Sequence, residues 1–115
     1  VPSDADVVRL AVRTTGVASE EIELLETVCQ VHDVGGMRSE RKKWSRQISS
    51  INVHAVFFVA SLSEFTQALC EDAAANRMGE SLQVLRDAMS MPALQKASFF
   101  LFLTKEDRLA SKLDG

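Results

Sequence analysis

The sequence is poor in several residue types that mark particular classes of protein. Its 115 residues include no tyrosine, one tryptophan, two prolines and two cysteines. Two cysteines that lack the spacing of metal ligands exclude a disulfide-rich scaffold and a zinc finger. No apolar run approaches the roughly 18 residues that a membrane span needs. Lys and Arg number 13 against 16 Asp and Glu, a net charge of -3, which argues against a general nucleic-acid-binding domain.

The remaining composition is that of a folded domain. Hydrophobic residues make up 46% of the chain and charged residues 25%, which is typical of one soluble globular domain with a modest core. The first ten residues include Asp4 and Asp6 and do not form an apolar segment. We therefore expect no signal peptide and a cytoplasmic protein. No linker, repeat or low-complexity segment divides the sequence.

Two apolar segments predict the centre of the fold. Residues 53–60 and 98–103 are rich in β-branched and aromatic side chains, as expected of strands buried on both faces. Between them, apolar residues recur three or four positions apart and predict one or two helices over residues 63–91. A strand, a helical crossover and a second strand predict parallel strands in an α/β sheet, with a ligand site at their carboxyl ends. A third strand is predicted over residues 24–33.

Polar residues follow these predicted strands. Asp33 precedes Gly35 and Gly36, a pattern in which the carboxylate can hold Mg²⁺ while backbone N–H groups approach a phosphate. The alternative is a strand followed by a glycine turn. Lys105 and Asp107 follow the last strand and could select guanine, with Lys105 along the purine ring and Asp107 accepting its N–H groups. The alternative there is a polar loop that caps a helix beginning near residue 106.

Together these segments resemble the α subunit of heterotrimeric G proteins. The resemblance rests on residues 6–16, on DVGG at 33–36 with RSERKKW at 38–44, on 76–82, and on 102–107. It implies an α/β fold of the Ras-like P-loop GTPase type, with a mostly parallel sheet and helices on both faces. Residues 1–115 would form part of that domain. Switch I would lie at about 9–16, switch II at about 33–48 with a helix over 39–48, and the guanine-specificity loop at 104–107.

The resemblance also implies roles for individual residues. GTP or GDP with Mg²⁺ would be bound, with Thr14 and Asp33 at the metal. Arg41 and Glu80 would couple switch II to the next helix in the GTP state. The implied partners are βγ subunits, a receptor and an effector. The partner-binding residues would be Arg38, Lys42, Lys43 and Trp44, because Trp and Arg dominate interface energies, although such a run can also be a solvated helix face. The implied nucleotide-binding residues are Arg9, Arg13, Thr14, Thr15, Asp33, Val34, Gly35, Gly36, Thr104, Lys105 and Asp107.

Three departures from the family pattern fall at positions important for catalysis and binding. Ala11 occupies the place of the arginine finger. Met37 occupies the place of the glutamine that orients the attacking water, which a thioether cannot do. The arginine contribution is known for GTPases of this kind to be on the order of 10³ to 10⁵ in rate. No catalytic position is therefore intact, and impaired GTP hydrolysis is expected. Thr104 replaces an asparagine, which predicts weaker guanine binding.

The 115 residues also contain no GxxxxGK[ST] phosphate loop. We therefore expect the phosphate-loop strand and the family's inserted helical domain to be absent, and the chain to be a middle portion or a divergent paralogue that binds GTP weakly alone. The first functional hypothesis is a guanine-nucleotide-binding signalling subunit downstream of G-protein-coupled receptors. The alternative is a nucleotide-free, catalytically dead module that binds βγ subunits or an effector through switch II. Partners or a lipidated N-terminus would hold it at the inner face of the plasma membrane.

Overall fold

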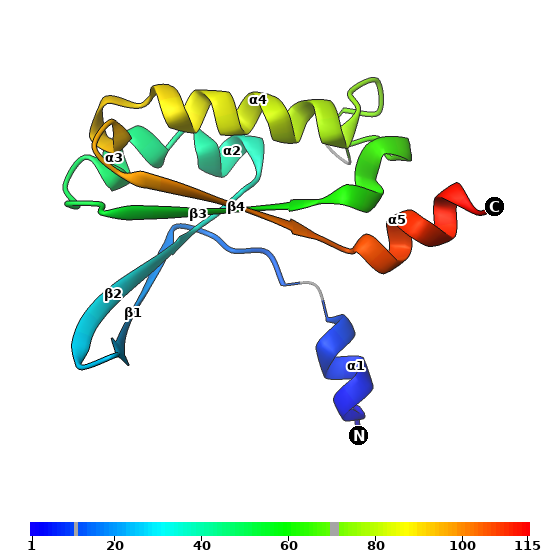
Figure 1. Cartoon of the computed structure of the whole chain (residues 1–115), viewed down its shortest axis with the longest axis horizontal. Coiled ribbons are helices and arrows are strands. Elements are labelled where there is room, and N and C mark those ends of the chain that lie inside the picture. Colours follow the sequence, from blue (N-terminus) through cyan, green and yellow to red (C-terminus); the bar gives the residue numbers. More distant parts are fainter. Residues whose placement is uncertain (11, 70–71) are drawn as a thin grey trace. The chain divides into compact units, whose positions relative to one another are not determined.

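The computed structural model describes residues 1–10, 12–69 and 72–115. The chain divides into two compact units, Val1–Ser50 and Ile51–Gly115, and each is described by itself (Figure 1).

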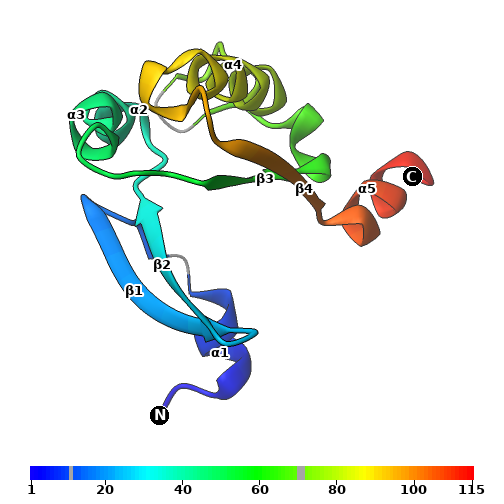
Figure 2. The same cartoon turned by 60° about the vertical axis from the view of Figure 1, so that its left-hand side comes forward.

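The first unit contains a helix, a β-hairpin and two short helices. Its elements are α1 (Asp4–Arg9), β1 (Val17–Leu24), β2 (Thr27–Val34), α2 (Arg38–Arg41) and α3 (Trp44–Ile48). Strands β1 and β2 pair antiparallel and form the long ribbon seen in Figure 2. The two residues of the connecting turn, Leu25 and Glu26, both have positive φ values of 48° and 63°, as a type I′ hairpin turn requires.

This hairpin corrects the prediction for the amino-terminal half. The strand predicted over residues 24–33 begins at Thr27, because Leu25 and Glu26 form the turn, and it extends to Val34. Its partner β1 was not predicted, because its sequence VASEEIEL contains glutamates, which are depleted in strands. Since β1 and β2 pair antiparallel, the predicted mostly parallel sheet does not describe this unit.

The second unit contains the predicted parallel pair. Its elements are β3 (Ala55–Ser61), the 3₁₀ helix η1 (Leu62–Thr66), α4 (Arg77–Ser90), η2 (Pro92–Leu94), β4 (Ser98–Thr104) and α5 (Glu106–Leu113). Strands β3 and β4 are parallel and in register from Ala55↔Ser98 to Ser61↔Thr104. The predicted helical crossover consists of η1 and α4. Helix α4 begins at a cap in which the Asn76 side chain accepts hydrogen bonds from two backbone N–H groups.

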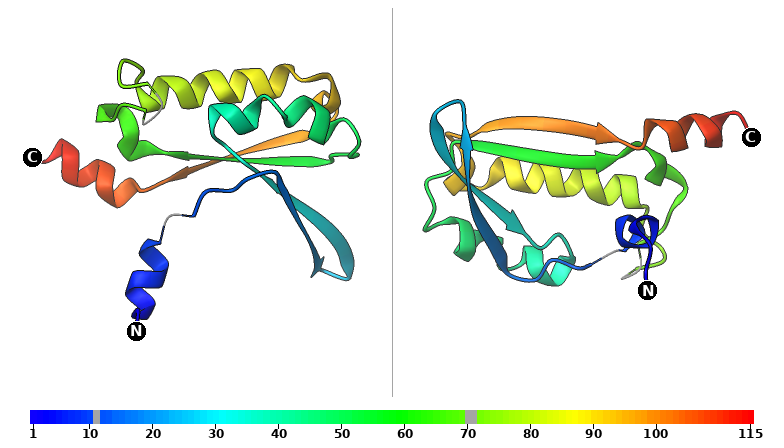
Figure 3. Two further views of the ribbon diagram at one scale, coloured as in Figure 1. Left: turned by 180° about the vertical axis from the view of Figure 1, so that it is seen from behind. Right: turned by 90° about the horizontal axis from the view of Figure 1, so that it is seen from below.

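Helix α4 lies along one face of the β3–β4 pair (Figure 3). The other face carries Phe57, Phe100 and Phe102, which are 68%, 49% and 47% exposed. The Phe57 ring meets the other two edge-on, with centroids 5.5 and 5.4 Å apart. The predicted helices on both faces are therefore not found among the described residues of this unit, whose buried apolar side chains are Ala88 and Leu94, each 4% exposed.

Candidate functional site

The two predicted metal ligands meet at the carboxyl end of β2. The Thr14 hydroxyl donates a hydrogen bond to Oδ2 of Asp33 over 3.3 Å. Thr14 lies just before β1, and Asp33 lies in β2 opposite Ala18 of β1, so the hairpin register brings together residues that are 19 positions apart. A hydroxyl and a carboxylate are oxygen donors of the kind that Mg²⁺ prefers.

This pair fits a magnesium ion that takes its other ligands from water and phosphate. Within residues 1–10, 12–69 and 72–115 there is no group of three or more His, Cys, Asp or Glu side chains that could hold a metal. Mg²⁺ commonly uses one or two protein carboxylates and completes its octahedron with water and substrate phosphates. A hydroxyl and a carboxylate, Thr14 and Asp33, are a donor set that such an ion can use.

Gly35 is the tightest point of the site. It is buried, and its N–H donates to the Gly16 carbonyl over 3.3 Å. A Cβ at Gly35 would lie 2.5 Å from the Thr14 carbonyl oxygen and 2.6 Å from Cγ of Glu40. The absence of a side chain at Gly35 thus lets residues 14–16 and helix α2 approach the same backbone. Gly36, by contrast, is exposed, and a Cβ there would meet nothing within 4 Å.

Glu40 was not predicted as a site residue, yet its carboxylate contacts both the segment before β1 and the turn that follows α2. It is 8% exposed. Its Oε2 accepts a hydrogen bond from the Gly16 N–H at 2.9 Å, and its Oε1 accepts one from Nζ of Lys43 at 2.8 Å. The Lys43 hydrogen bond, and after it the Gly16 hydrogen bond, hold the pKa of Glu40 below its ordinary value. The sequence signal that could have identified Glu40 is its position three residues before a lysine, inside a basic run.

The basic segment after the glycines forms two short helices. The single helix predicted over 39–48 is wrong in this respect, because Lys42 and Lys43 form a turn between α2 and α3. Trp44, half-buried, donates its indole N–H to the Gly35 carbonyl over 2.8 Å. Lys42 is exposed, whereas the Lys43 ammonium contacts Glu40. Within the chain, one of the predicted partner-binding residues, Trp44, therefore also supports the glycine turn.

The other predicted residues of the first unit lie in several of its segments. Arg9 is the last residue of α1, and Val34 is the last residue of β2. Arg13 and Thr15 are exposed in the segment that precedes β1. Arg38 and Arg41 begin and end α2 and are half-buried. Met37 is the residue before α2 and provides no side-chain cap, whereas Ala11 lies outside the described residues.

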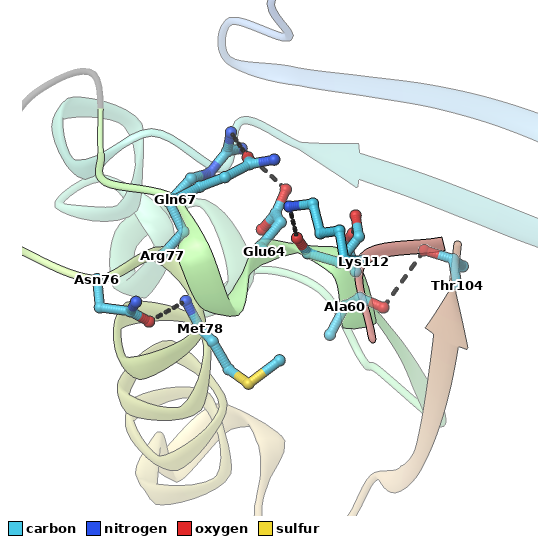
Figure 4. Close-up of polar contacts among 10 residues, drawn as sticks. Ala60, Glu64, Gln67, Asn76, Arg77, Met78, Thr104 and Lys112 are labelled. Carbon is cyan, nitrogen blue, oxygen red and sulfur yellow. Dashed lines mark hydrogen bonds and ion pairs between the residues drawn. The ribbon is translucent and has the colours of Figure 1, made fainter. Parts of the chain in front are cut away.

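The predicted guanine-specificity loop lies in the second unit, at the carboxyl end of β4. Thr104 ends β4, and its hydroxyl donates to the Ala60 carbonyl over 3.3 Å (Figure 4). Lys105 has φ 60° and ψ 40°, the left-handed conformation, and makes no side-chain cap to α5. Asp107 lies exposed in the first turn of α5. A helix does begin at Glu106, as the alternative interpretation expected, but neither Lys105 nor Asp107 caps it through its side chain.

A polar network on η1 was also not predicted. Arg77, the first residue of α4, forms an ion pair with Glu64 at 3.0 Å. From α5, the Lys112 ammonium donates to the Ser63 carbonyl at 2.6 Å and to the Thr66 hydroxyl at 2.8 Å. These contacts fix the start of α4 and the last turn of α5 against η1 (Figure 4). Glu80, predicted to couple to Arg41, lies in the first turn of α4, and that coupling stays a prediction.

Comparison with known proteins agrees with the resemblance seen in the sequence. The family model described as "G-protein alpha subunit" matches residues 1–115. The guanine nucleotide-binding protein alpha-7 subunit of Caenorhabditis elegans is 43% identical over 113 residues, which cover 98% of this chain and 32% of that protein. A guanine nucleotide-binding protein subunit alpha of Coprinellus congregatus is 42% identical, covering 98% of this chain and 31% of that protein. The chain thus spans about a third of the length of these relatives. Among its described residues, no helix has the length and apolar character needed to cross a membrane.

Proposed function

Because the chain belongs to the family of G-protein α subunits, we propose that it forms the part of a guanine-nucleotide-binding signalling subunit that carries two switch segments and a guanine-recognition loop. The family has a Ras-like GTPase domain, and the α/β elements of both units are of that class. The observation that carries the proposal is the 3.3 Å contact between Thr14 and Asp33. This contact brings together, at the end of β2, the two oxygen groups that are proposed to hold a nucleotide-bound Mg²⁺.

Different residues of the chain are proposed to bind the metal, the phosphate and the guanine base. Thr14 and Asp33 would hold Mg²⁺, which, when bound, neutralises phosphate charge. Gly36, exposed and without a side chain, offers its backbone N–H to the terminal phosphate. Lys105 and Asp107 would contact the guanine base. Arg9, Arg13, Thr15, Val34 and Thr104 are proposed as supporting contacts to the nucleotide.

Hydrolysis by this chain would be impaired. Met37 offers a thioether, which cannot orient the attacking water as an amide can, and Ala11 offers no charge to the transition state. The subunit would therefore respond to which nucleotide is bound while converting GTP to GDP slowly.

Partner binding is proposed for the basic segment after the glycines. Arg38, Lys42, Lys43 and Trp44 would contact βγ subunits, and Arg41 would pair with Glu80 when GTP is bound. A receptor and an effector complete the signalling role, which is proposed to take place at the inner face of the plasma membrane. Trp44 donates to the Gly35 carbonyl and Lys43 donates to Glu40, so a partner that engages these two residues would also affect the residues proposed to bind phosphate.

Titration with a fluorescent GTP analogue tests the nucleotide role. The 115-residue chain is titrated with and without Mg²⁺, beside an ATP analogue and the variants Asp33→Asn and Asp114→Asn. Asp114 follows α5 and is exposed, so its variant makes the same charge change away from the site. We expect saturable, Mg²⁺-dependent binding that prefers guanine and that weakens about tenfold or more in Asp33→Asn alone, because a charged ligand to the metal is lost.

The second candidate function is the nucleotide-free interaction module. It is favoured by the two substituted positions, Ala11 and Met37. Absence of saturable binding by the 115-residue chain, together with retained binding of βγ subunits, would establish this alternative and reject nucleotide binding by the chain itself.

A further inference from the structure

The carboxylate of Glu40 joins two segments that lie 24 residues apart in the sequence. Its two oxygens have different donors, the Gly16 N–H at 2.9 Å and the Lys43 ammonium at 2.8 Å. The side chain is 10% exposed, whereas that of Lys43 is 55% exposed. A buried carboxylate with a hydrogen bond to each oxygen has a defined position, because moving it would leave a charged group without its partners.

A local ion pair does not account for this arrangement. An i,i+3 pair with one exposed partner contributes little to stability, and it requires no contact beyond the two residues that form it. Here the second oxygen of Glu40 bonds to backbone of the segment before β1. Three further contacts surround that bond: Gly35 N–H to the Gly16 carbonyl, Trp44 indole N–H to the Gly35 carbonyl, and the Thr14 hydroxyl to Asp33.

Helix α2 depends on contacts of this kind. It has four residues, far fewer than an isolated helix needs for stability in water. Its residue before the first turn, Met37, forms no side-chain cap. The orientation of α2 must therefore come from tertiary contacts, and Glu40 is the buried residue of that helix.

We propose that Glu40 is a positioning residue that ties helix α2 to residues 14–16 and so keeps Thr14 beside Asp33. Through this tie the two segments move together: displacement of α2 withdraws the acceptor of the Gly16 N–H and releases the backbone that carries Thr14. The link to magnesium rests on the proposed function, whereas the tie itself involves only residues of this chain.

Amide hydrogen exchange tests the tie directly. The ¹⁵N-labelled 115-residue chain is compared with Glu40→Ala, Glu40→Gln and Glu20→Ala by NMR, without nucleotide or metal. Glu20 is an exposed glutamate of β1 in the same unit, so its variant is the matched control. Glu40→Ala should speed exchange of the Gly16 amide about tenfold or more, as expected when a hydrogen bond to a charged group is lost. It should also shift the Thr14 and Asp33 amide resonances.

Rescue by the conservative variant separates positioning from general stability. Glu40→Gln keeps an oxygen acceptor for the Gly16 N–H, so it should restore most of the Gly16 protection, and Glu20→Ala should match the wild type. Amides of the β3–β4 pair should exchange at unchanged rates in all four proteins. The proposal would be overturned by a Gly16 amide that is unprotected in the wild type, by one that is unchanged in Glu40→Ala, or by acceleration that is equal at β3–β4. Because no nucleotide is used, this result is independent of the titration that tests nucleotide binding.

Discussion

Replacing Gly35 with alanine is the most direct test of how closely the two segments approach each other. Three heavy atoms would lie within 2.8 Å of the new methyl group: the Thr14 carbonyl oxygen at 2.5 Å, and Cγ and Cβ of Glu40 at 2.6 and 2.8 Å. Real Cβ atoms essentially never approach other atoms within 3.0 Å. One of the three is backbone and another lies next to the backbone of α2, so rotation of a flexible side chain cannot relieve the clash.

The expected cost follows from overpacking. Forcing an extra methyl into a well-packed site typically costs about 1–3 kcal/mol, and three simultaneous clashes place Gly35→Ala toward the upper end. Gly36→Ala is the matched control, because its methyl would meet nothing within 4 Å and its φ lies outside the left-handed region. A compatible Gly→Ala change stabilises a protein by about 0.4–1 kcal/mol through the unfolded chain. The two neighbouring substitutions should therefore change the free energy of unfolding in opposite directions.

Urea unfolding followed by tryptophan fluorescence measures this difference. Trp44 is the chain's only tryptophan and lies in the first unit, so its emission reports on the unit that contains both glycines. Linear extrapolation of the fluorescence transition gives the free energy of unfolding of each variant. Equal stability of Gly35→Ala and the wild type would refute the close approach of residues 14–16 and α2, and a comparable loss in Gly36→Ala would show that any side chain in this turn is harmful.

Two further outcomes are expected. The pKa of Glu40 lies below its ordinary value of 4.5, chiefly because of the Lys43 hydrogen bond and then that of Gly16, so the folded state favours the ionised carboxylate. Its stabilisation is therefore fully present above about pH 4.5 and is lost as the pH falls through the lower, folded-state pKa. The stability advantage of the wild type over Glu40→Gln in urea unfolding should shrink in that acidic range, and an advantage that stays constant with pH would contradict this assignment. Separately, Met37→Gln combined with Ala11→Arg, in a chain extended by a phosphate loop, should raise single-turnover GTP hydrolysis by on the order of 10³ or more. Unchanged hydrolysis would mean that the roles given to positions 11 and 37 are wrong.

The strands were predictable to different degrees because they are stabilised differently. Strands β3 and β4 were located within about two residues, since continuous apolar runs reflect burial that the sequence itself encodes. Strand β1 was missed because its polar residues are satisfied by a partner strand. Ser19 bonds to the His32 ring at 2.7 Å, and Glu21 accepts a hydrogen bond from Gln30 at 3.3 Å. Cross-strand pairs of this kind stabilise a strand whose own residues disfavour it.

Residues of the candidate site could be predicted only where they belong to a recognisable sequence motif. Asp33 was suggested by the two glycines that follow it, but its pairing with Thr14 at one metal came only through the family resemblance, since nothing local connects residues 19 positions apart. Glu40 was overlooked because a glutamate within a run of lysines and arginines is typical of a solvated helix face. Its burial depends on the Gly16 backbone, which comes from another part of the chain. Likewise, the break between α2 and α3 places Trp44 at the Gly35 carbonyl, a contact that periodicity does not encode.

The left-handed backbone conformation of Lys105 makes lysine an unfavourable residue for folding at this position. Its φ of 60° lies in the left-handed region, which costs a residue with a Cβ about 1–2 kcal/mol and costs glycine almost nothing. Glycine would therefore serve the junction between β4 and α5 better than lysine if only folding mattered. The fold thus carries a conformational penalty at the one position of this loop where a long cationic side chain is proposed to meet a purine, and the demands of folding and of recognition oppose each other in a single residue.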